Sequence, residues 1–168
     1  MVLIMENKKI MLLVVLILII CVAAGVILTL NTIQYERVEI SPNGTSIEIP
    51  TDHREYVGDV SGVKCWKWNY GVLLSYDDSA VNNSINFSGI SIGFDMVEKL
   101  IKQNSKTNID GYEVYMLDSN TLESIVKMNI GGKFYCIILD NETNHDTVVV
   151  CCNDKDVAVH MAHSINYK

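Results

Sequence analysis

The stretch 133–163, KFYCIILDNETNHDTVVVCCNDKDVAVHMAH, places two apolar runs and one helical repeat in close succession. Residues 133–139 and 147–152 are short and rich in β-branched and aromatic side chains, which predicts two strands. The polar loop between them predicts an antiparallel hairpin. Behind the hairpin, three apolar side chains recur at helical spacing and predict a C-terminal helix: Val157, Met161 and Ile165.

The chain from Tyr35 to this hairpin also consists mainly of short β-type runs separated by Gly, Asn, Asp and Ser. Strands are predicted over 38–40, 46–49, 64–70, 72–76, 111–117 and 122–130, and a helix over 95–105. Loops are predicted over 51–62 and 77–89. Because the helices follow groups of strands, the pattern predicts the α+β class, an antiparallel sheet with about two packed helices.

The apolar block Ile10–Leu30 has 21 residues without a charge. As a helix it would be roughly 30 Å long, the thickness of a bilayer's hydrocarbon core. A signal peptide cut near Val22-Ala23-Ala24 is the alternative, but the apolar run continues beyond that point. We therefore expect an uncut N-terminal transmembrane helix over residues 10–32.

The flanking charges predict the orientation of this span. Lys8 and Lys9 precede it, and cations favour the cytoplasmic side. We expect residues 1–9 in the cytoplasm and residues 36–168 outside, as one extracytoplasmic domain of a single-pass cell-membrane protein. After residue 30 the chain has 11 Lys and Arg against 19 Asp and Glu, which excludes nucleic acid as a partner.

Three segments of the outer part carry a resemblance. They are the opening strand Gly44-Thr-Ser-Ile-Glu-Ile-Pro50, the mid-domain Ile109-Asp-Gly-Tyr-Glu-Val-Tyr115, and the closing Met161-Ala-His-Ser-Ile-Asn-Tyr167. In the order and the residue patterns of these segments, the chain resembles the Mog1/PsbP-like α/β/α sandwich, as in small membrane-anchored proteins of methanogenic archaea. It departs from that pattern at 51–53, where relatives often place a Trp. The resemblance implies a binding or accessory role and no site residue.

Cys136 and Cys151 are predicted to face each other across the hairpin. If Asp140 lies opposite Thr147, the register places these two cysteines directly opposite, at a Cβ separation close to that of a disulfide. Cys65 and Cys152 are candidates for a second pair. The pattern leaves open whether these cysteines are bonded or are free thiols in buried strands.

The sulfur and imidazole groups near the C-terminus suggest a zinc site at first sight. Cys151 and Cys152 are adjacent on a strand, so their side chains point to opposite faces. His160 and His163 lie on the polar side of the predicted helix. The four groups do not converge on one tetrahedral ion, and we expect neither metal nor cofactor.

Trp66, Trp68 and Tyr70 alternate along one predicted strand and would share one face. Such a row either fills the core beneath a helix or forms an exposed face for a sugar or peptide.

Four glycosylation sequons, at Asn43, Asn82, Asn86 and Asn141, lie in predicted loops or at their edges. Their placement agrees with an outside location.

No motif of nucleophilic or metal-assisted hydrolysis is present in the sequence, and its four histidines, His53, His145, His160 and His163, are scattered. We therefore expect a domain that is not an enzyme and that binds another envelope protein. Two alternatives stay open. One is a metal- or redox-linked envelope protein that uses the outer cysteines, and the other is an adhesin-like surface module that uses Trp66 and Trp68.

Overall fold

The computed structural model describes residues 32–41, 43–60, 63–77, 84–87, 90–118 and 132–168. The chain divides into two compact units, 1–34 and 35–168, and the described residues belong almost entirely to the second. Among these residues, no helix is both long and apolar enough to cross a membrane. The predicted span over 10–32 lies, apart from Thr32, outside the described residues.

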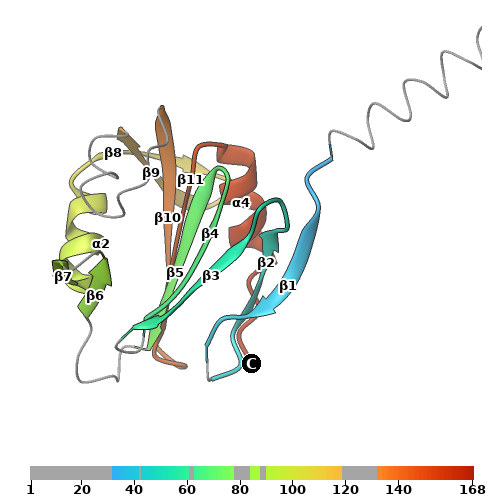
Figure 1. The fold of residues 1–168 in the computed structure, drawn as a ribbon. Helices are drawn as coiled ribbons and strands as arrows, with labels where there is room; N and C mark the ends of the chain where they lie inside the picture. Colours follow the sequence, from blue (N-terminus) through green and yellow to red (C-terminus); the bar gives the residue numbers. More distant parts are fainter. Residues whose placement is uncertain (1–31, 42, 61–62, 78–83, 88–89, 119–131) are drawn as a thin grey trace, which may run out of the picture. The chain divides into compact units, whose positions relative to one another are not determined.

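Seven strands form the central antiparallel sheet, in the order β3-β4-β5-β11-β10-β9-β8 (Figure 1). Their bounds are Glu55–Val60 (β3), Val63–Trp68 (β4), Gly71–Asp77 (β5), Ser105–Ile109 (β8), Tyr112–Asp118 (β9), Lys133–Asn141 (β10) and Asp146–Cys152 (β11). All seven residues of β11 are buried. Its nearly continuous apolar run is typical of a strand with neighbours on both edges and cover on both faces.

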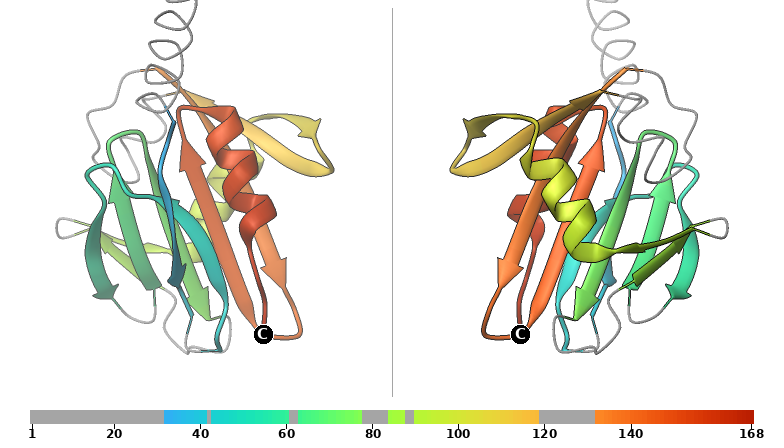
Figure 2. Two further views of the ribbon diagram at one scale, coloured as in Figure 1. Left: turned by 90° about the vertical axis from the view of Figure 1, so that its right-hand side faces the viewer. Right: turned by 90° about the vertical axis from the view of Figure 1, so that its left-hand side faces the viewer.

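Two hairpins and two helices complete the described fold. The hairpins are β1 (Tyr35–Glu39) with β2 (Ser46–Pro50), and β6 (Ser84–Phe87) with β7 (Ile90–Gly93). The helices are α2 (Phe94–Lys102) and α4 (Lys155–Ser164). The two helices lie on opposite faces of the central sheet, as both views of Figure 2 show.

The central sheet separates two hydrophobic cores because side chains alternate between the faces of each strand. On one face, Leu73 and Val150 pack with Met161 of α4 and Ile47 of β2. On the other face, the core beneath α2 contains Leu74, Phe134 and Cys136 of the sheet with Val97 and Ile101 of the helix.

Gly71 begins β5 at a point where the backbone and two side chains crowd together. A Cβ atom at this position would lie 2.5 Å from Trp68 Cζ2, 2.6 Å from Cys152 Cβ and 2.7 Å from the Cys151 carbonyl oxygen. Real Cβ atoms do not approach other heavy atoms this closely. Only glycine therefore lets the start of β5 pack directly against the end of β11.

The predicted α+β class is wrong, because the described chain is mostly β. It has eleven strands and only two helices, of 9 and 10 residues. Three predicted irregular or helical stretches are strands: β3 lies in the predicted loop 51–62, β6 in the predicted loop 77–89, and β8 begins at the end of the predicted helix 95–105. The predicted strand over 122–130 lies outside the described residues.

Candidate functional site

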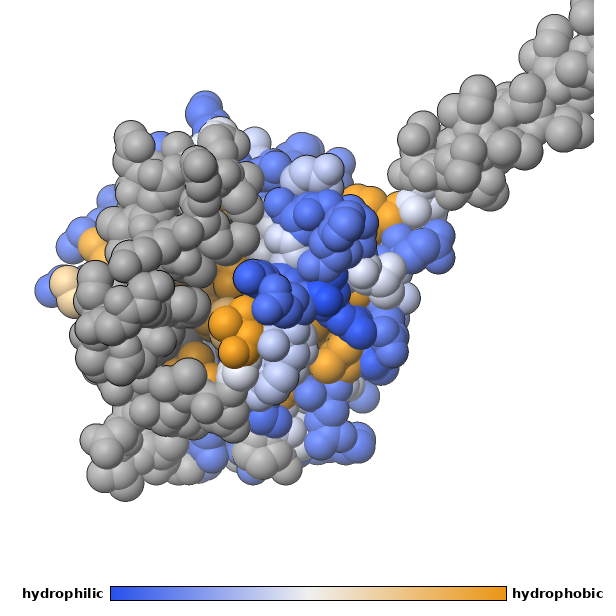
Figure 3. Space-filling view, in the orientation of Figure 1, coloured by the Kyte–Doolittle hydropathy of each residue, from blue (hydrophilic) through white to orange (hydrophobic). Residues whose placement is uncertain are grey.

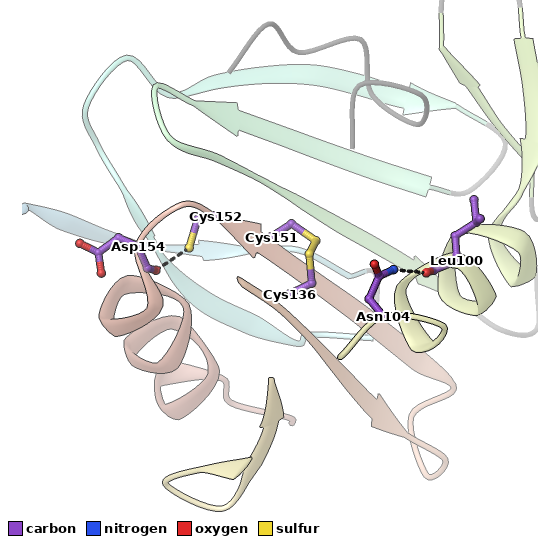
Figure 4. The surroundings of a disulfide bond; sticks show 6 residues. All are labelled: Leu100, Asn104, Cys136, Cys151, Cys152 and Asp154. Carbon is purple, nitrogen blue, oxygen red and sulfur yellow. Dashed lines mark hydrogen bonds between the residues drawn. A yellow bond between two sulfur atoms is a disulfide. The ribbon is translucent and has the colours of Figure 1, made fainter. Parts of the chain in front are cut away.

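The predicted register of the hairpin, in which Cys136 faces Cys151, is confirmed. In the β10–β11 ladder Asp140 lies opposite Thr147, and Cys136 lies opposite Cys151 with a Cα–Cα distance of 4.2 Å. The two sulfur atoms form a disulfide on the α2 side of the sheet (Figure 4). Both residues are buried, so the cross-link lies inside the core beneath α2.

The candidate second pair, Cys65 with Cys152, does not form. Cys65 belongs to the core beneath α2, whereas Cys152 belongs to the core beneath α4, so the sheet separates the two thiols. Burial raises the pKa of each thiol from 9.0 to about 12. The Cys152 thiol also donates a 3.0 Å hydrogen bond to the carbonyl oxygen of Asp154 (Figure 4). Both thiols are therefore protonated, and neither is a good nucleophile or metal ligand at neutral pH.

The aromatic row divides between the core and the surface. Trp66 and Trp68 are only 6% and 4% exposed and pack beneath the β1–β2 hairpin and α4. Tyr70 follows β4 in a turn and is 54% exposed. The three rings consequently form no continuous exposed face, and Trp66 instead contacts the ring of Tyr56 at a centroid distance of 4.9 Å.

The four histidines are all exposed and occupy separate places. His53 and His145 lie in turns with positive φ. His160 and His163 lie on the outward side of α4, His160 next to β1–β2 and His163 next to Tyr112 of β9. In the described parts of the chain, no three His, Cys, Asp or Glu side chains gather as metal ligands would.

The asparagines of the four glycosylation sequons lie in different environments. The Asn43 amide nitrogen donates to the Asn144 carbonyl oxygen at 2.8 Å and to Asp146 Oδ1 at 3.2 Å. The side-chain oxygen of Asn141 accepts hydrogen bonds from two backbone N–H groups of its own turn. Asn82 lies outside the described residues, and Asn86 lies in β6.

A buried polar cluster surrounds the carboxylate of Asp146. Asp146 is fully buried at the start of β11 and accepts hydrogen bonds from the side chains of Ser41, Asn43 and Thr45. These three donors lie in the turn between β1 and β2. A buried carboxylate needs such donors to offset its loss of hydration, so this contact fastens the hairpin to the sheet.

Polar and aromatic side chains from β1, β2 and α4 meet at the surface in what we call the hairpin–helix cluster: Tyr35, Arg37, Glu48, His160 and Ser164. Arg37 donates to Glu48 Oε1 at 3.2 Å and to the Ser164 carbonyl oxygen at 2.9 Å. His160 Nε2 lies 3.0 Å from Glu48 Oε2. Glu48 therefore joins the guanidinium of β1 to the imidazole of α4.

The aromatic ring of Tyr35 completes this cluster. It lies against the ring of His160 with a centroid distance of 4.0 Å. Burial, and then the nearby Cys152, Asp154 and Glu48, raise the pKa of the Tyr35 hydroxyl to about 12. The hydroxyl thus stays protonated and is a hydrogen-bond donor at all physiological pH values.

The sequence contains only part of the signal for this cluster. Tyr35 and Arg37 are two residues apart on one strand and share a face, and the hairpin register places Arg37 opposite Glu48. His160 is 112 residues from Glu48 in the chain, and only the docking of α4 brings the two together.

On the face drawn in Figure 3, apolar side chains reach the surface in small patches bordered by polar ones. No family model, curated protein or solved structure matches the chain. No comparison therefore identifies the Mog1/PsbP-like fold that the sequence resembles.

Proposed function

We propose that residues 35–168 form a non-catalytic domain that binds another envelope protein, and that the apolar residues 10–30 hold it in the cell membrane with the domain outside. The hairpin–helix cluster is the observation that carries the binding role. Its Arg37, His160 and Glu48 side chains are 45%, 44% and 33% exposed, so a partner can reach them.

The composition of the cluster suits a protein interface. Tyr and Arg are enriched in such interfaces and at the positions that contribute most to affinity. The side chains are also already held in place, since Glu48 binds both Arg37 and His160, and Tyr35 packs on the imidazole. Preorganised side chains lose less conformational entropy when a partner binds.

The disulfide supports a location outside the cytoplasm. Disulfides form and persist in oxidising compartments and are rare in the cytosol. The bond between Cys136 and Cys151 agrees with the orientation that Lys8 and Lys9 favour in the sequence.

The surroundings of the remaining thiols argue against a redox or metal role. Cys65 and Cys152 are buried on opposite faces of the sheet, and burial raises the pKa of each to about 12. Redox-active cysteines have lowered pKa values and solvent access. The adhesin-like alternative needs exposed rings at Trp66 and Trp68, and both rings are in the core.

A position-specific photo-cross-linker tests the proposal in the membrane of the producing cell. A photoreactive amino acid at position 160 should give a discrete covalent adduct with one other protein. The same amino acid at Met96, a 58% exposed residue of α2, serves as the control because α2 lies on the other face of the sheet.

Alanine substitutions then test the chemistry of the surface. Arg37→Ala should reduce the adduct formed from position 160, whereas Lys155→Ala, at the exposed start of the same helix, should leave it unchanged. Equal adducts from positions 160 and 96, or an adduct from position 160 that is unchanged by Arg37→Ala, would contradict the proposed binding surface.

A further inference from the structure

The edge strand β8 differs from the other edge of the seven-stranded sheet. β3, at one end of the strand order, has a register shift between Tyr56 and Gly58, a β-bulge that disturbs its edge. β8, at the other end, pairs with β9 in unbroken register from Ser105 to Ile109. Residues 105–108 are exposed, and the β8–β9 hairpin projects from the body in both views of Figure 2.

Proteins usually protect such an edge with a bulge, a proline or charged side chains. β8 has no proline and no carboxylate, although the chain after residue 30 carries 19 Asp and Glu. Its single cation, Lys106, forms an ion pair with Glu113 of the neighbouring strand. The edge is therefore regular and nearly neutral on an acidic domain, and it is suited to pairing with another strand.

The turn at the end of β8 determines which backbone groups face outward. Asp110 and Gly111 have φ values of 51° and 90°, and they form a two-residue turn that joins Ile109 to Tyr112. The pair that flanks such a turn is hydrogen-bonded, and hydrogen-bonded pairs alternate along an antiparallel ladder. The backbone N–H and C=O groups of Lys106 and Asn108 therefore point away from β9.

We propose that β8 pairs antiparallel with β8 of a second copy of this chain, about a twofold axis at Thr107. In this register Lys106 lies opposite Asn108 of the second copy, and the outward backbone N–H and C=O groups of the two residues bond to each other. The twofold axis repeats this pair, because Asn108 of the first copy also lies opposite Lys106 of the second. The two Thr107 side chains then face each other in a non-hydrogen-bonded pair, and cross-strand Thr pairs are favourable.

Charge and backbone geometry exclude the two neighbouring symmetric registers. An axis at Lys106 places two ammonium groups directly opposite each other, which is unfavourable. An axis at Asn108 requires Asp110 to pair as an extended residue, but its backbone is in the left-handed region, with φ 51°. The axis at Thr107 avoids both conflicts and uses the whole of β8. This interface is separate from the hairpin–helix cluster.

Cysteine cross-linking in the full-length chain, in its membrane, tests the register. All variants carry Cys21→Ser, and the two free thiols after residue 30, Cys65 and Cys152, are buried. Thr107→Cys places two thiols on residues whose Cβ atoms are about 4.5–5.5 Å apart, and mild oxidation should give a covalent dimer. Ser105→Cys places them four residues out of register, about 14 Å apart, and should give none.

A proline substitution tests the backbone pairing. Lys106→Pro removes an outward N–H group without removing a β8–β9 hydrogen bond, whereas Lys106→Ala removes the same side chain and keeps that group. In the Thr107→Cys background, Lys106→Pro should abolish the dimer and Lys106→Ala should keep it. A monomeric Thr107→Cys protein, equal dimers from positions 105 and 107, or equal effects of proline and alanine would each overturn the proposal.

Discussion

The Ser41 hydroxyl donates a 2.7 Å hydrogen bond to the carboxylate of Asp146, although 105 residues separate the two in the chain. Thr45, which is also fully buried, donates to the second oxygen of the same carboxylate. The turn of the β1–β2 hairpin is thereby bound to the first residue of the central strand β11.

Asp146→Asn should destabilise the domain by about 3 kcal/mol, since hydrogen bonds to a buried charge each contribute about 1.5–3 kcal/mol. The side chains around this carboxylate donate to both of its oxygens, so an amide nitrogen in place of one oxygen no longer accepts a hydrogen bond and the charge that strengthens the others is lost. Urea unfolding followed by circular dichroism measures the loss. Thr45→Val should also be destabilising, whereas Thr143→Val in the exposed β10–β11 loop should change stability by less than about 0.5 kcal/mol. Equal effects of the two Thr→Val changes would show that Asp146 does not fasten the hairpin.

Reduction of the Cys136–Cys151 disulfide should lower the free energy of unfolding. The bridge spans 15 residues, and a loop of this size contributes about 3 kcal/mol through the lost entropy of the unfolded chain. Urea midpoints with and without reductant measure the difference. The Cys136→Ala/Cys151→Ala double variant should have the same urea midpoint with and without reductant. If the wild-type midpoint were also unchanged by reductant, the disulfide would be absent or would not stabilise the domain.

The free thiols should make the domain sensitive to alkali. Burial raises the folded-state pKa of Cys65 and Cys152 from 9.0 to about 12, so the unfolded chain releases these protons first. Their contribution to stability is complete below pH 9 and is lost as the pH rises towards 12. Between pH 9 and 10 the urea midpoint should fall, and it should fall less in Cys65→Ala/Cys152→Ala. Tyr35 and Tyr167 add a similar loss above pH 10, because burial raises their pKa from 10.0 to about 12.

Gly71→Ala should destabilise the domain by about 3 kcal/mol, the upper range for forcing extra volume into a packed site. The new Cβ would meet backbone and side-chain atoms at 2.5–2.7 Å. Gly132→Ala is the control, since it has free space around it but a φ of +118°. That change should cost about 1–2 kcal/mol of backbone strain alone. Thermal unfolding measures both variants, and equal melting temperatures for Gly71→Ala and Gly132→Ala would contradict the close packing at Gly71.

The β10–β11 hairpin and the alignment of its two cysteines could be predicted because local patterns determine them, whereas the sequence left the bond between them open. Two apolar strands flank a polar loop, and one assumed pair, Asp140 with Thr147, is enough to align Cys136 with Cys151. The C-terminal helix was predicted for a similar reason, since its apolar spacing and acidic first turn lie within a few residues.

The edge strands and the polar contacts could not be predicted in this way. β8 carries mainly polar, exposed side chains, so its sequence resembles a helix end, whereas β3 (EYVGDV) lacks a regular alternation and contains a glycine, so its sequence resembles a loop. The class was mistaken because these missed strands shift the balance from α+β to mostly β. His160, which contacts Glu48, and the three donors to Asp146 each lie more than 100 residues from their partner in the chain, and only the packed fold brings them together.

The domain's amino-terminal strand, β1, pairs with β2 in a separate two-stranded sheet and not with the seven strands that contain the disulfide. A mechanical pull on the chain before Tyr35 would therefore act first on β1 and separate its pairs with β2 one after another. The cross-linked sheet would remain folded until a larger force was reached. Under tension the protein should lengthen in two steps, the first of them short and reversible.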